Sequence, residues 1–550
     1  MKADVVFLNG EIVTVDGNNR VVEAVAVKDN RIIAVGSNEE ISEYITSATD
    51  IIKLDGKSLL PGFIDAHLHL TIYGTNLLGV SCIEPHILSL ENIFADLRKK
   101  AQETPKGKWV RAWGFNETNL IESRFPTREE LDKISVDHPI VIIRTCNHTS
   151  IANSKALEIA GITDNTANPE GGIIEHNPDG SLTGKLIENA HMQLFEFASY
   201  TDEELRKGMK LASDEFIQAG ITSVHDAGAY GEGSETLRIM QQAVNSKDIK
   251  VRVYAIIGSL TNSHDFVHKM VEAGPITGLG DHRFKIGPAK VFTDGSSTGP
   301  TIATREPYTH NSNDYGITYY SQEELDSILG EAHKKGFQIT AHAQGDRAIE
   351  MFLNCIEKAL SNYPRKDHRH RIEHAGIASP DLQERMKMLG VVTIPNPVFM
   401  YVNGEKYLEY YGDRVNVMYP SRDYIDQGII AAFGSDSPVT LLDPLLGIHA
   451  AVNRESQEGH SVGKNQCIGI MEAIRAYTWN GAFASFEENF KGSIEVGKLA
   501  DLVILNESIL HVDKRNIKDV KVELTMINGE VLFDPKRLSQ KTNNERIISS

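Results

Sequence analysis

The sequence contains little cysteine, and its few cysteines are scattered. They form no Cys-x-x-Cys pair, which excludes a disulfide scaffold and a thiolate zinc site and indicates a reducing compartment. The sequence also lacks an apolar run of about 18 residues, the length that a membrane-spanning helix needs. The start lacks the basic and apolar regions of a signal peptide. We therefore expect a cytoplasmic protein without membrane association. The four cysteines are Cys82, Cys146, Cys355 and Cys467.

Positive charge is also scarce. The 56 Lys and Arg residues are outnumbered by 75 Asp and Glu residues, which gives a formal net charge of −19 at pH 7. A chain with this charge repels phosphate backbones, so no nucleic-acid partner is expected. The longest basic cluster, residues 365–371, is interrupted by Asp367 and is typical of a solvated loop.

Short alternating runs of apolar and polar residues occupy both ends of the chain. In residues 1–60 they are separated by tight-turn signals such as Asn9–Gly10 and Asp16–Gly17, which predict antiparallel strands. Residues 485–540 repeat this pattern, with another turn signal at Asn528–Gly529. Because neither end is long enough for a core of its own, we expect both termini to form one small β-sandwich.

Residues 61–484 instead repeat a helix, a glycine and an apolar strand. One helix begins with a capping box at residues 201–204 and ends at Gly220; a second begins at residues 321–324 and ends at Gly336. This repeat predicts an α/β fold, a (β/α)₈ TIM barrel, with an open doubly wound sheet as the alternative. The eight predicted strands are residues 60–66, 221–226, 251–257, 284–292, 338–342, 371–374, 391–395 and 430–436.

The first two predicted strands are separated by residues 71–200, far more than the few residues of an ordinary βα loop. This segment has a helix pattern of its own near residues 90–101 and a hairpin-like stretch, GGIIEHNPDGSLTGKLIE. We interpret it as a large insertion, a cap subdomain over the barrel mouth. Loops at that face carry function in TIM barrels, so substrate selectivity is expected to reside here.

Ionisable side chains gather at the ends of the predicted strands. In LLPGFIDAHLHL, His67 and His69 lie two residues apart on a strand, so both side chains point the same way and can bind one cation. A histidine in a core strand is more often a packing residue. Here, however, several strands end alike at the face where TIM-barrel active sites form, which predicts a metal site with a position open for water. The other strand-end residues are His225, His342, His374 and Asp436.

Lys290 lies inside the fourth predicted strand. A buried lysine is costly unless it is paired, and the ordinary alternative is a side chain whose charged end reaches the surface. A lysine that points into a barrel can instead carry a carbamate and act as a carboxylate that bridges two metal ions.

Taken in order, these motifs resemble the amidohydrolase superfamily over nearly the whole chain. The matching pieces are NGEIVTVD, PGFIDAHLHL, AKVFTDGS, ITAHAQGD, RIEHA, FGSDSP and GSIEVGKLADLVIL, and together they look like the branch that includes N-substituted formamide deformylases. The resemblance implies that Lys290 is the carboxylated bridge of binuclear members and that Asp436 binds metal and moves the proton. His225 has no counterpart. The implied metal ligands are His67, His69, Lys290, His342, His374 and Asp436.

We therefore expect a hydrolase that cleaves a non-peptide carbon–nitrogen bond of an amide or formamide type. Its cofactor would be one or two ions of Zn²⁺ or another divalent transition metal, which make hydroxide available at neutral pH. The alternatives are a metal-dependent deaminase of a small amine or heterocycle, and a regulatory protein on a catalytically retired barrel. The complete set of implied ligands argues against the second alternative.

The expected partner is a small-molecule substrate, and a homo-oligomer is left open. For His225 a role in packing or in orienting a ligand is an equal alternative to contact with substrate, and for Trp113 packing of the cap is the ordinary one. Candidate substrate-binding residues are His225, Asp294, Ser296, His148 and Trp113.

Overall fold

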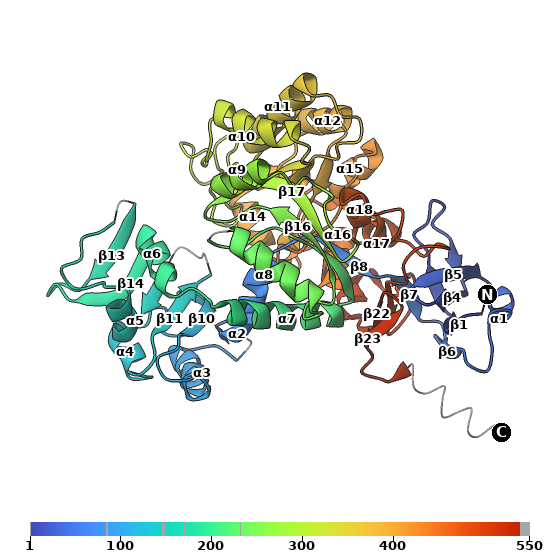
Figure 1. Cartoon of the computed structure of the whole chain (residues 1–550). Coiled ribbons are helices and arrows are strands. Elements are labelled where there is room, and N and C mark those ends of the chain that lie inside the picture. The colour runs from blue at the N-terminus through green and yellow to red at the C-terminus, as the bar shows by residue number, and fades with distance from the viewer. Residues whose placement is uncertain (1, 84–85, 146–148, 170, 232, 539–550) are drawn as a thin grey trace. The chain divides into compact units, whose positions relative to one another are not determined.

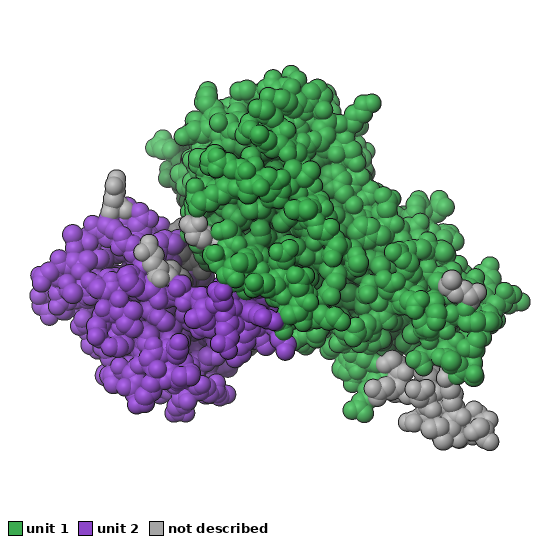
Figure 2. Space-filling view, viewed as in Figure 1, with its two compact units in different colours: residues 1–70, 213–550 green, residues 71–212 purple. Residues whose placement is uncertain are grey.

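The computed structural model describes residues 2–538 except 84–85, 146–148, 170 and 232. The chain divides into two compact units, shown in separate colours in Figure 2. The barrel unit comprises residues 1–70 and 213–550, and the inserted unit comprises residues 71–212. Within the described residues, no helix is both long enough and apolar enough to span a membrane.

Seven parallel strands form the central sheet of the barrel unit (Figure 1), in the order β20-β19-β18-β17-β16-β15-β8. Most of their residues are buried, as expected for a parallel sheet covered on both faces. Their bounds are β8 (Phe63–Leu68), β15 (Ile221–Asp226), β16 (Arg252–Ile257), β17 (Phe284–Phe292), β18 (Ile339–Ala343), β19 (Arg371–His374) and β20 (Val392–Ile394).

The eighth predicted strand, residues 430–436, closes this sheet without forming a regular strand. On one side, Thr393 of β20 forms a single parallel bridge to Ala431. On the other, the backbone N–H of Ala66 donates to the carbonyl of Phe433 at 3.0 Å. Because the segment joins both edges of the seven-stranded sheet, the barrel is closed. The TIM-barrel prediction is confirmed, and an open doubly wound sheet is excluded.

The helices of the barrel unit begin and end where the sequence signals place them. Ser321 caps α10 (Gln322–Lys334) with a complete capping box. Pro380 occupies the first turn of α12 (Pro380–Leu389), and Gly390 ends that helix in the left-handed conformation. The remaining helices are α1 (Asn38–Ser42), α8 (Gly233–Asn245), α9 (Ser263–Ala273), α11 (Asp346–Asn362), α13 (Pro397–Val402), α14 (Gly404–Tyr411), α15 (Ser421–Gln427), α16 (Pro444–Asn453), α17 (Ile470–Ala476) and α18 (Trp479–Ala484).

Strands from both termini form two sheets that share one apolar core. The link between the termini is the antiparallel pair of β7 and β21, in which Leu60 lies opposite Val503. This confirms that both ends of the chain build one β-sandwich, whereas the exact boundaries 1–60 and 485–540 stay a prediction. One sheet contains β5 (Arg31–Gly36), β4 (Ala24–Lys28), β1 (Val5–Leu8) and β6 (Asp50–Lys53); the other contains β23 (Glu530–Phe533), β22 (Val522–Ile527), β21 (Leu502–Leu505), β7 (Ser58–Pro61), β2 (Glu11–Val13) and β3 (Val21–Val22).

The inserted unit has a sheet of its own, in the order β13-β14-β12-β11-β10-β9. The hairpin-like stretch of the sequence forms the antiparallel pair β13–β14, and the predicted helix is α3 (Leu90–Glu103). Placement of this unit over the barrel mouth stays a prediction. Its strands are β9 (Val80–Ser81), β10 (Val110–Phe115), β11 (Ile140–Arg144), β12 (Thr149–Ala152), β13 (Gly172–His176) and β14 (Leu182–Glu188). Its other helices are α4 (Arg128–Asp132), α5 (Ser154–Ile159) and α6 (Asn189–Phe197). The boundaries between the two units fall within α2 (Leu70–Leu78) and α7 (Asp202–Gln218).

Candidate metal centre

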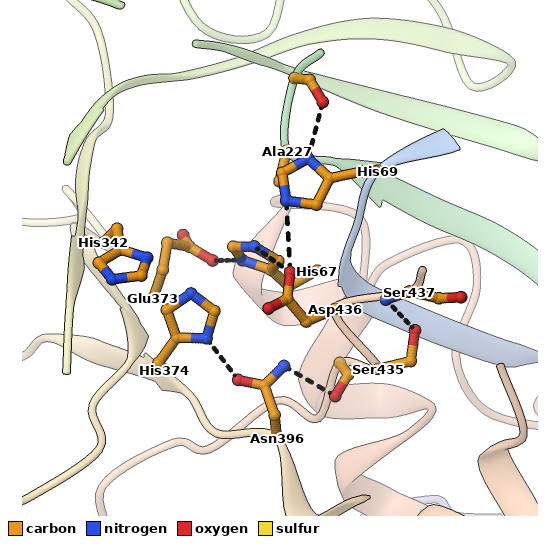
Figure 3. Close-up of polar contacts among 12 residues, drawn as sticks. His67, His69, Ala227, His342, Glu373, His374, Asn396, Ser435, Asp436 and Ser437 are labelled. Carbon is orange, nitrogen blue, oxygen red and sulfur yellow. Dashed lines mark hydrogen bonds and ion pairs between the residues drawn. The ribbon is translucent and has the colours of Figure 1, made fainter. Parts of the chain in front are cut away.

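Two histidines at the carboxyl end of β8 and one aspartate at the end of the closing segment, residues 430–436, point at each other (Figure 3). The Nε2 atom of His67 lies 3.4 Å from Oδ1 of Asp436, and Nε2 of His69 lies 3.3 Å from the same oxygen. All three residues are buried, and their ligand atoms lie within 4.8 Å of one another. His67, His69 and Asp436, which the sequence places at the ends of predicted strands, thus lie together in one compact cluster.

The hydrogen bonds of the two histidine rings determine where their protons lie. Nδ1 of His67 is 2.5 Å from the Glu373 carboxylate, and Nδ1 of His69 is 2.7 Å from the carbonyl of Gly228. A carboxylate and a carbonyl can only accept, so each Nδ1 carries a proton, and Nε2 is the nitrogen whose lone pair a cation can use.

These lone pairs converge on another acceptor, because Oδ1 of Asp436 is buried and has no hydrogen-bond partner. Three buried acceptors that face one another repel unless a cation lies among them. Two imidazole nitrogens and a carboxylate oxygen are ligands that zinc and related divalent metals accept. The side chains of this site therefore fit a divalent metal ion.

His342 and His374 extend the cluster. The His374 ring centre lies 4.7 Å from that of His67 and 4.6 Å from that of His342. Nε2 of His342 donates to the carbonyl of Gly295 at 2.8 Å, and Nδ1 of His374 donates to the amide oxygen of Asn396 at 2.7 Å. Each ring therefore keeps one nitrogen with a free lone pair. Burial lowers the pKa of His342 to about 4 and that of His374 well below its ordinary value, so both rings are neutral at pH 7.

Lys290 lies beside these histidines, inside the barrel. Its side chain on β17 is fully buried, and its Nζ atom is 3.5 Å from Nε2 of His67 and 3.4 Å from the carbonyl of Ala227. Burial lowers the pKa of Lys290 to about 8. These contacts exclude the alternative that the charged end of the lysine reaches the surface.

The backbone is strained at two of the predicted ligands. His374 has φ 69° and Asp436 has φ 59°, in a region that costs residues other than glycine about 1–3 kcal/mol. Glu373 and His374 are adjacent on a strand, where successive side chains normally point to opposite faces. Here both side chains lie next to His67: Glu373 contacts its Nδ1 atom, and the ring of His374 lies beside its ring. The left-handed turn at His374 is what allows both side chains to face the centre.

A model of the amidohydrolase family matches residues 50–533 of this sequence. The chain belongs to that family. Its relatives include a Bacillus subtilis protein named as the amidohydrolase YtcJ, which is 30% identical over 93% of this chain and 96% of its own length. An N-substituted formamide deformylase of Arthrobacter pascens is 28% identical over 96% of this chain and 98% of its own length.

Among solved structures, a metal-dependent hydrolase from Pyrococcus horikoshii OT3 matches this amidohydrolase with a TM-score of 0.78. The two are 27% identical, and the match covers 93% of this chain and 99% of the other. The family membership confirms the resemblance seen in the motifs, and with it the prediction of an amidohydrolase enzyme of the metal-dependent superfamily.

Sequence reasoning missed several buried residues that position the cluster of this amidohydrolase. Asp65 accepts the backbone N–H groups of His67 at 3.1 Å and of Ser435 at 3.0 Å, which ties β8 to the closing segment. Burial raises the pKa of Asp65 to about 6. Glu373 and Arg371 form a fully buried ion pair with Nε and Oε1 2.6 Å apart. Asp65, Arg371 and Glu373 are each a charged residue inside an apolar strand. Because charged residues are rarely buried without a partner, this pattern could have identified them.

The candidate substrate-binding residues lie in different surroundings. His225 is wholly buried, and its Nδ1 accepts a hydrogen bond from Arg371 at 2.9 Å, a position that suits the orienting or packing alternative. Asp294 is also buried and accepts the backbone N–H groups of Ala303, Gln344 and Gly345. It thereby holds together the loops that follow β17 and β18.

The other three candidates are Ser296, Trp113 and His148. Ser296 is exposed, and its hydroxyl lies 3.0 Å from that of Thr298. Trp113 belongs to β10 of the inserted unit, where its indole N–H is buried without a hydrogen-bond partner. His148 lies outside the described residues. Contact of any of these residues with a substrate stays a prediction.

Proposed function

We propose that this amidohydrolase hydrolyses the carbon–nitrogen bond of a small amide or formamide, with one or two ions of zinc or another divalent transition metal. The observation that carries the proposal is the buried cluster in which Nε2 of His67 and Nε2 of His69 both face Oδ1 of Asp436. The relative named as an N-substituted formamide deformylase supports the reaction class. The proposed ligands are His67, His69, Lys290, His342, His374 and Asp436.

A divalent ion bound by this set supplies Lewis acidity, which lowers the pKa of water and polarises a carbonyl. The proposed proton carrier is Asp436. Its backbone N–H donates to the carbonyl of His67 at 2.7 Å, which holds the carboxylate over the end of β8. The carboxylate accepts a proton from water as oxygen adds to the carbonyl carbon, and returns it to nitrogen as the carbon–nitrogen bond breaks.

We further propose that Lys290 carries a carbamate. The ammonium first releases a proton; the neutral Nζ amine then adds to the carbon of carbon dioxide and releases a second proton, which leaves a carbamate with one negative charge. Its position 3.5 Å from Nε2 of His67 supports this role, because a carboxylate there would add a negatively charged ligand to the histidine cluster. The site would then hold two ions.

The test is a substrate screen with metal-free protein reloaded with Zn²⁺, Mn²⁺ or Co²⁺. N-formyl, N-acyl and cyclic amides are supplied together with small amines and amino-substituted heterocycles, and formate or carboxylate, free amine and ammonia are measured in parallel. We expect formate or carboxylate to appear in a one-to-one ratio with the new amine, and to stop when a chelator is added. Ammonia release from an exocyclic or ring amine without a carboxylate product would instead show a deaminase. Lack of turnover in every metal-loaded sample would contradict the proposal.

A further inference from the structure

A fully buried carboxylate stands directly behind His67. Glu373 lies on β19, and each of its two oxygens meets two hydrogen-bond donors. Oε2 accepts from Nδ1 of His67 at 2.5 Å and from Nη2 of Arg371 at 2.9 Å. Oε1 accepts from Nε of Arg371 at 2.6 Å and from the hydroxyl of Thr340 at 2.6 Å. The carboxylate therefore cannot rotate without losing a hydrogen bond.

Arg371 is anchored to two further strands. Its Nη2 donates to the carbonyl of Ala66 at 2.7 Å and its Nη1 donates to Nδ1 of His225 at 2.9 Å. The Arg371–Glu373 pair thus connects β8, β15, β18 and β19 behind the metal cluster. A buried ion pair is weak evidence for stability, because the desolvation cost offsets its attraction, and a positioning role accounts better for its place here.

We propose that Glu373 is a positioning residue that fixes the tautomer and ring orientation of His67, so that the Nε2 lone pair always faces the metal. This inference rests on the metal site of the proposed function and goes beyond it, since it assigns a residue that touches neither metal nor substrate. A carboxylate on the far nitrogen of a ligating histidine also raises the basicity of the ring, which strengthens metal binding.

The variant Glu373→Gln tests this role because an amide cannot satisfy both neighbours. If its oxygen faces His67, its NH₂ group faces the Nε–H donor of Arg371. If its NH₂ group faces His67, Nδ1 must become the acceptor and the proton moves to Nε2, which can then no longer bind a metal. In either arrangement we expect His67 to bind the metal less tightly, although the side chain at position 373 keeps its size.

The measurement is the Kd for Zn²⁺ of the purified full chain, determined by competition with a chromophoric chelator, with the visible spectrum of the Co²⁺-loaded protein as a second readout. We expect the Kd of Glu373→Gln to rise about 10–100-fold and its Co²⁺ bands to shift. The matched control is Glu487→Gln. Glu487 is also a buried carboxylate, paired with Lys491 at 2.6 Å and with Lys285 at 3.0 Å, and we expect its loss to leave the Zn²⁺ affinity unchanged.

If Glu373→Gln does not fold, Thr340→Val replaces it. That variant keeps the shape and removes one donor to Oε1, so a smaller loss of Zn²⁺ affinity in the same direction is expected. The inference is overturned if the folded variant binds Zn²⁺ as tightly as wild type, or if Glu487→Gln loses as much affinity. If wild type binds Zn²⁺ but hydrolyses no amide, only the proposed function fails; if wild type binds no Zn²⁺, both fail.

Discussion

Asp436 stands where the closing segment of the barrel meets the end of β8. Its Oδ1 faces the lone pairs of His67 and His69, and its backbone is held in the strained left-handed conformation. The strain is maintained because the N–H of Asp436 is bonded to the carbonyl of His67. One side chain thus serves both as a proposed ligand and as the proposed base, and these two roles can be separated by substitution.

Asp436→Asn keeps an oxygen for the metal but removes the group that accepts a proton. We expect metal content close to that of wild type, and a fall in kcat of about 10²–10⁴-fold, the usual contribution of general base catalysis. Metal analysis and steady-state kinetics on the substrate found in the screen measure the two effects. The control is Asp443→Asn, in the same loop. Asp443 caps α16 through the N–H of Leu445 at 2.9 Å, and because Asn caps a helix about as well as Asp, this variant should keep both its stability and its kcat. Undiminished turnover in Asp436→Asn would remove the proposed base.

Lys290→Ala tests the carbamate. If the lysine bridges two ions, the variant should lose about half of the bound metal, because one shared ligand of a two-metal site disappears. Metal analysis after dialysis with added bicarbonate gives the stoichiometry. Lys285→Ala is the control, since Lys285 lies on the same strand but pairs with Glu487. The same metal content in Lys290→Ala and wild type would indicate a mononuclear site that does not use the lysine.

The element that completes the site is the closing segment, residues 430–436. It approaches β8 so closely that a Cβ atom at Gly434 would lie 2.6 Å from the backbone N and 2.7 Å from the Cβ of His67. Glycine is therefore required at this position by close approach of two backbones. Asn396 supports the same approach, because its amide donates to the carbonyl of Gly434 at 2.9 Å while its oxygen accepts from His374.

Gly434→Ala should therefore push the closing segment away from His67. We expect a loss of about 1–3 kcal/mol in stability, typical of overpacking, together with weaker Zn²⁺ binding. Thermal unfolding and chelator competition measure both. Gly330→Ala, inside α10, is the matched control: nothing lies within 4 Å of its added Cβ, so it should gain up to about 1 kcal/mol from helix propensity. A Gly434→Ala protein as stable and as metal-replete as wild type would contradict this account.

In the barrel unit as a whole, the sandwich and the barrel are joined by a buried ion pair. Arg252 on β16 donates to Asp501, which directly precedes β21, through two hydrogen bonds of 2.6 and 2.8 Å. Burial alone would raise the pKa of Asp501, but Arg252 and the backbone N–H of Asn528 hold that pKa below its ordinary value. The pair therefore links two parts of the fold that are nearly 250 residues apart in sequence.

Because the folded pKa of Asp501 is depressed, its contribution to stability is present above the unfolded pKa of about 3.9 and is lost as the pH falls through the folded value. Asp501→Asn leaves Arg252 unpaired, so we expect a loss of about 3–5 kcal/mol near pH 7 and a shallower fall in Tm between pH 4 and pH 2. The control is Asp265→Asn, which breaks an exposed pair with Lys269 worth about 0–1 kcal/mol. Equal Tm values for Asp501→Asn and wild type at pH 7 would refute the prediction.

The sequence by itself determined the elements and the chemistry. Capping boxes, terminal glycines and apolar strands predicted the barrel, because these signals act between residues near in sequence. It also marked the candidate metal ligands from their places at or near strand ends, and the structure brings these side chains together. They are His67, His69, Lys290, His342, His374 and Asp436.

Only the tertiary structure decided what surrounds those side chains. Glu373, Arg371 and Asp65 were missed because their roles depend on partners from distant strands, such as the pairing of Glu373 with His67 across 306 residues. Asp294 holds two loops through three backbone N–H groups, a role that its loop motif does not reveal. Packing and hydrogen bonds between strands set the direction of the His374 side chain at the end of β19. They also set which nitrogen of the His67 ring carries a proton. No local pattern in the sequence records those.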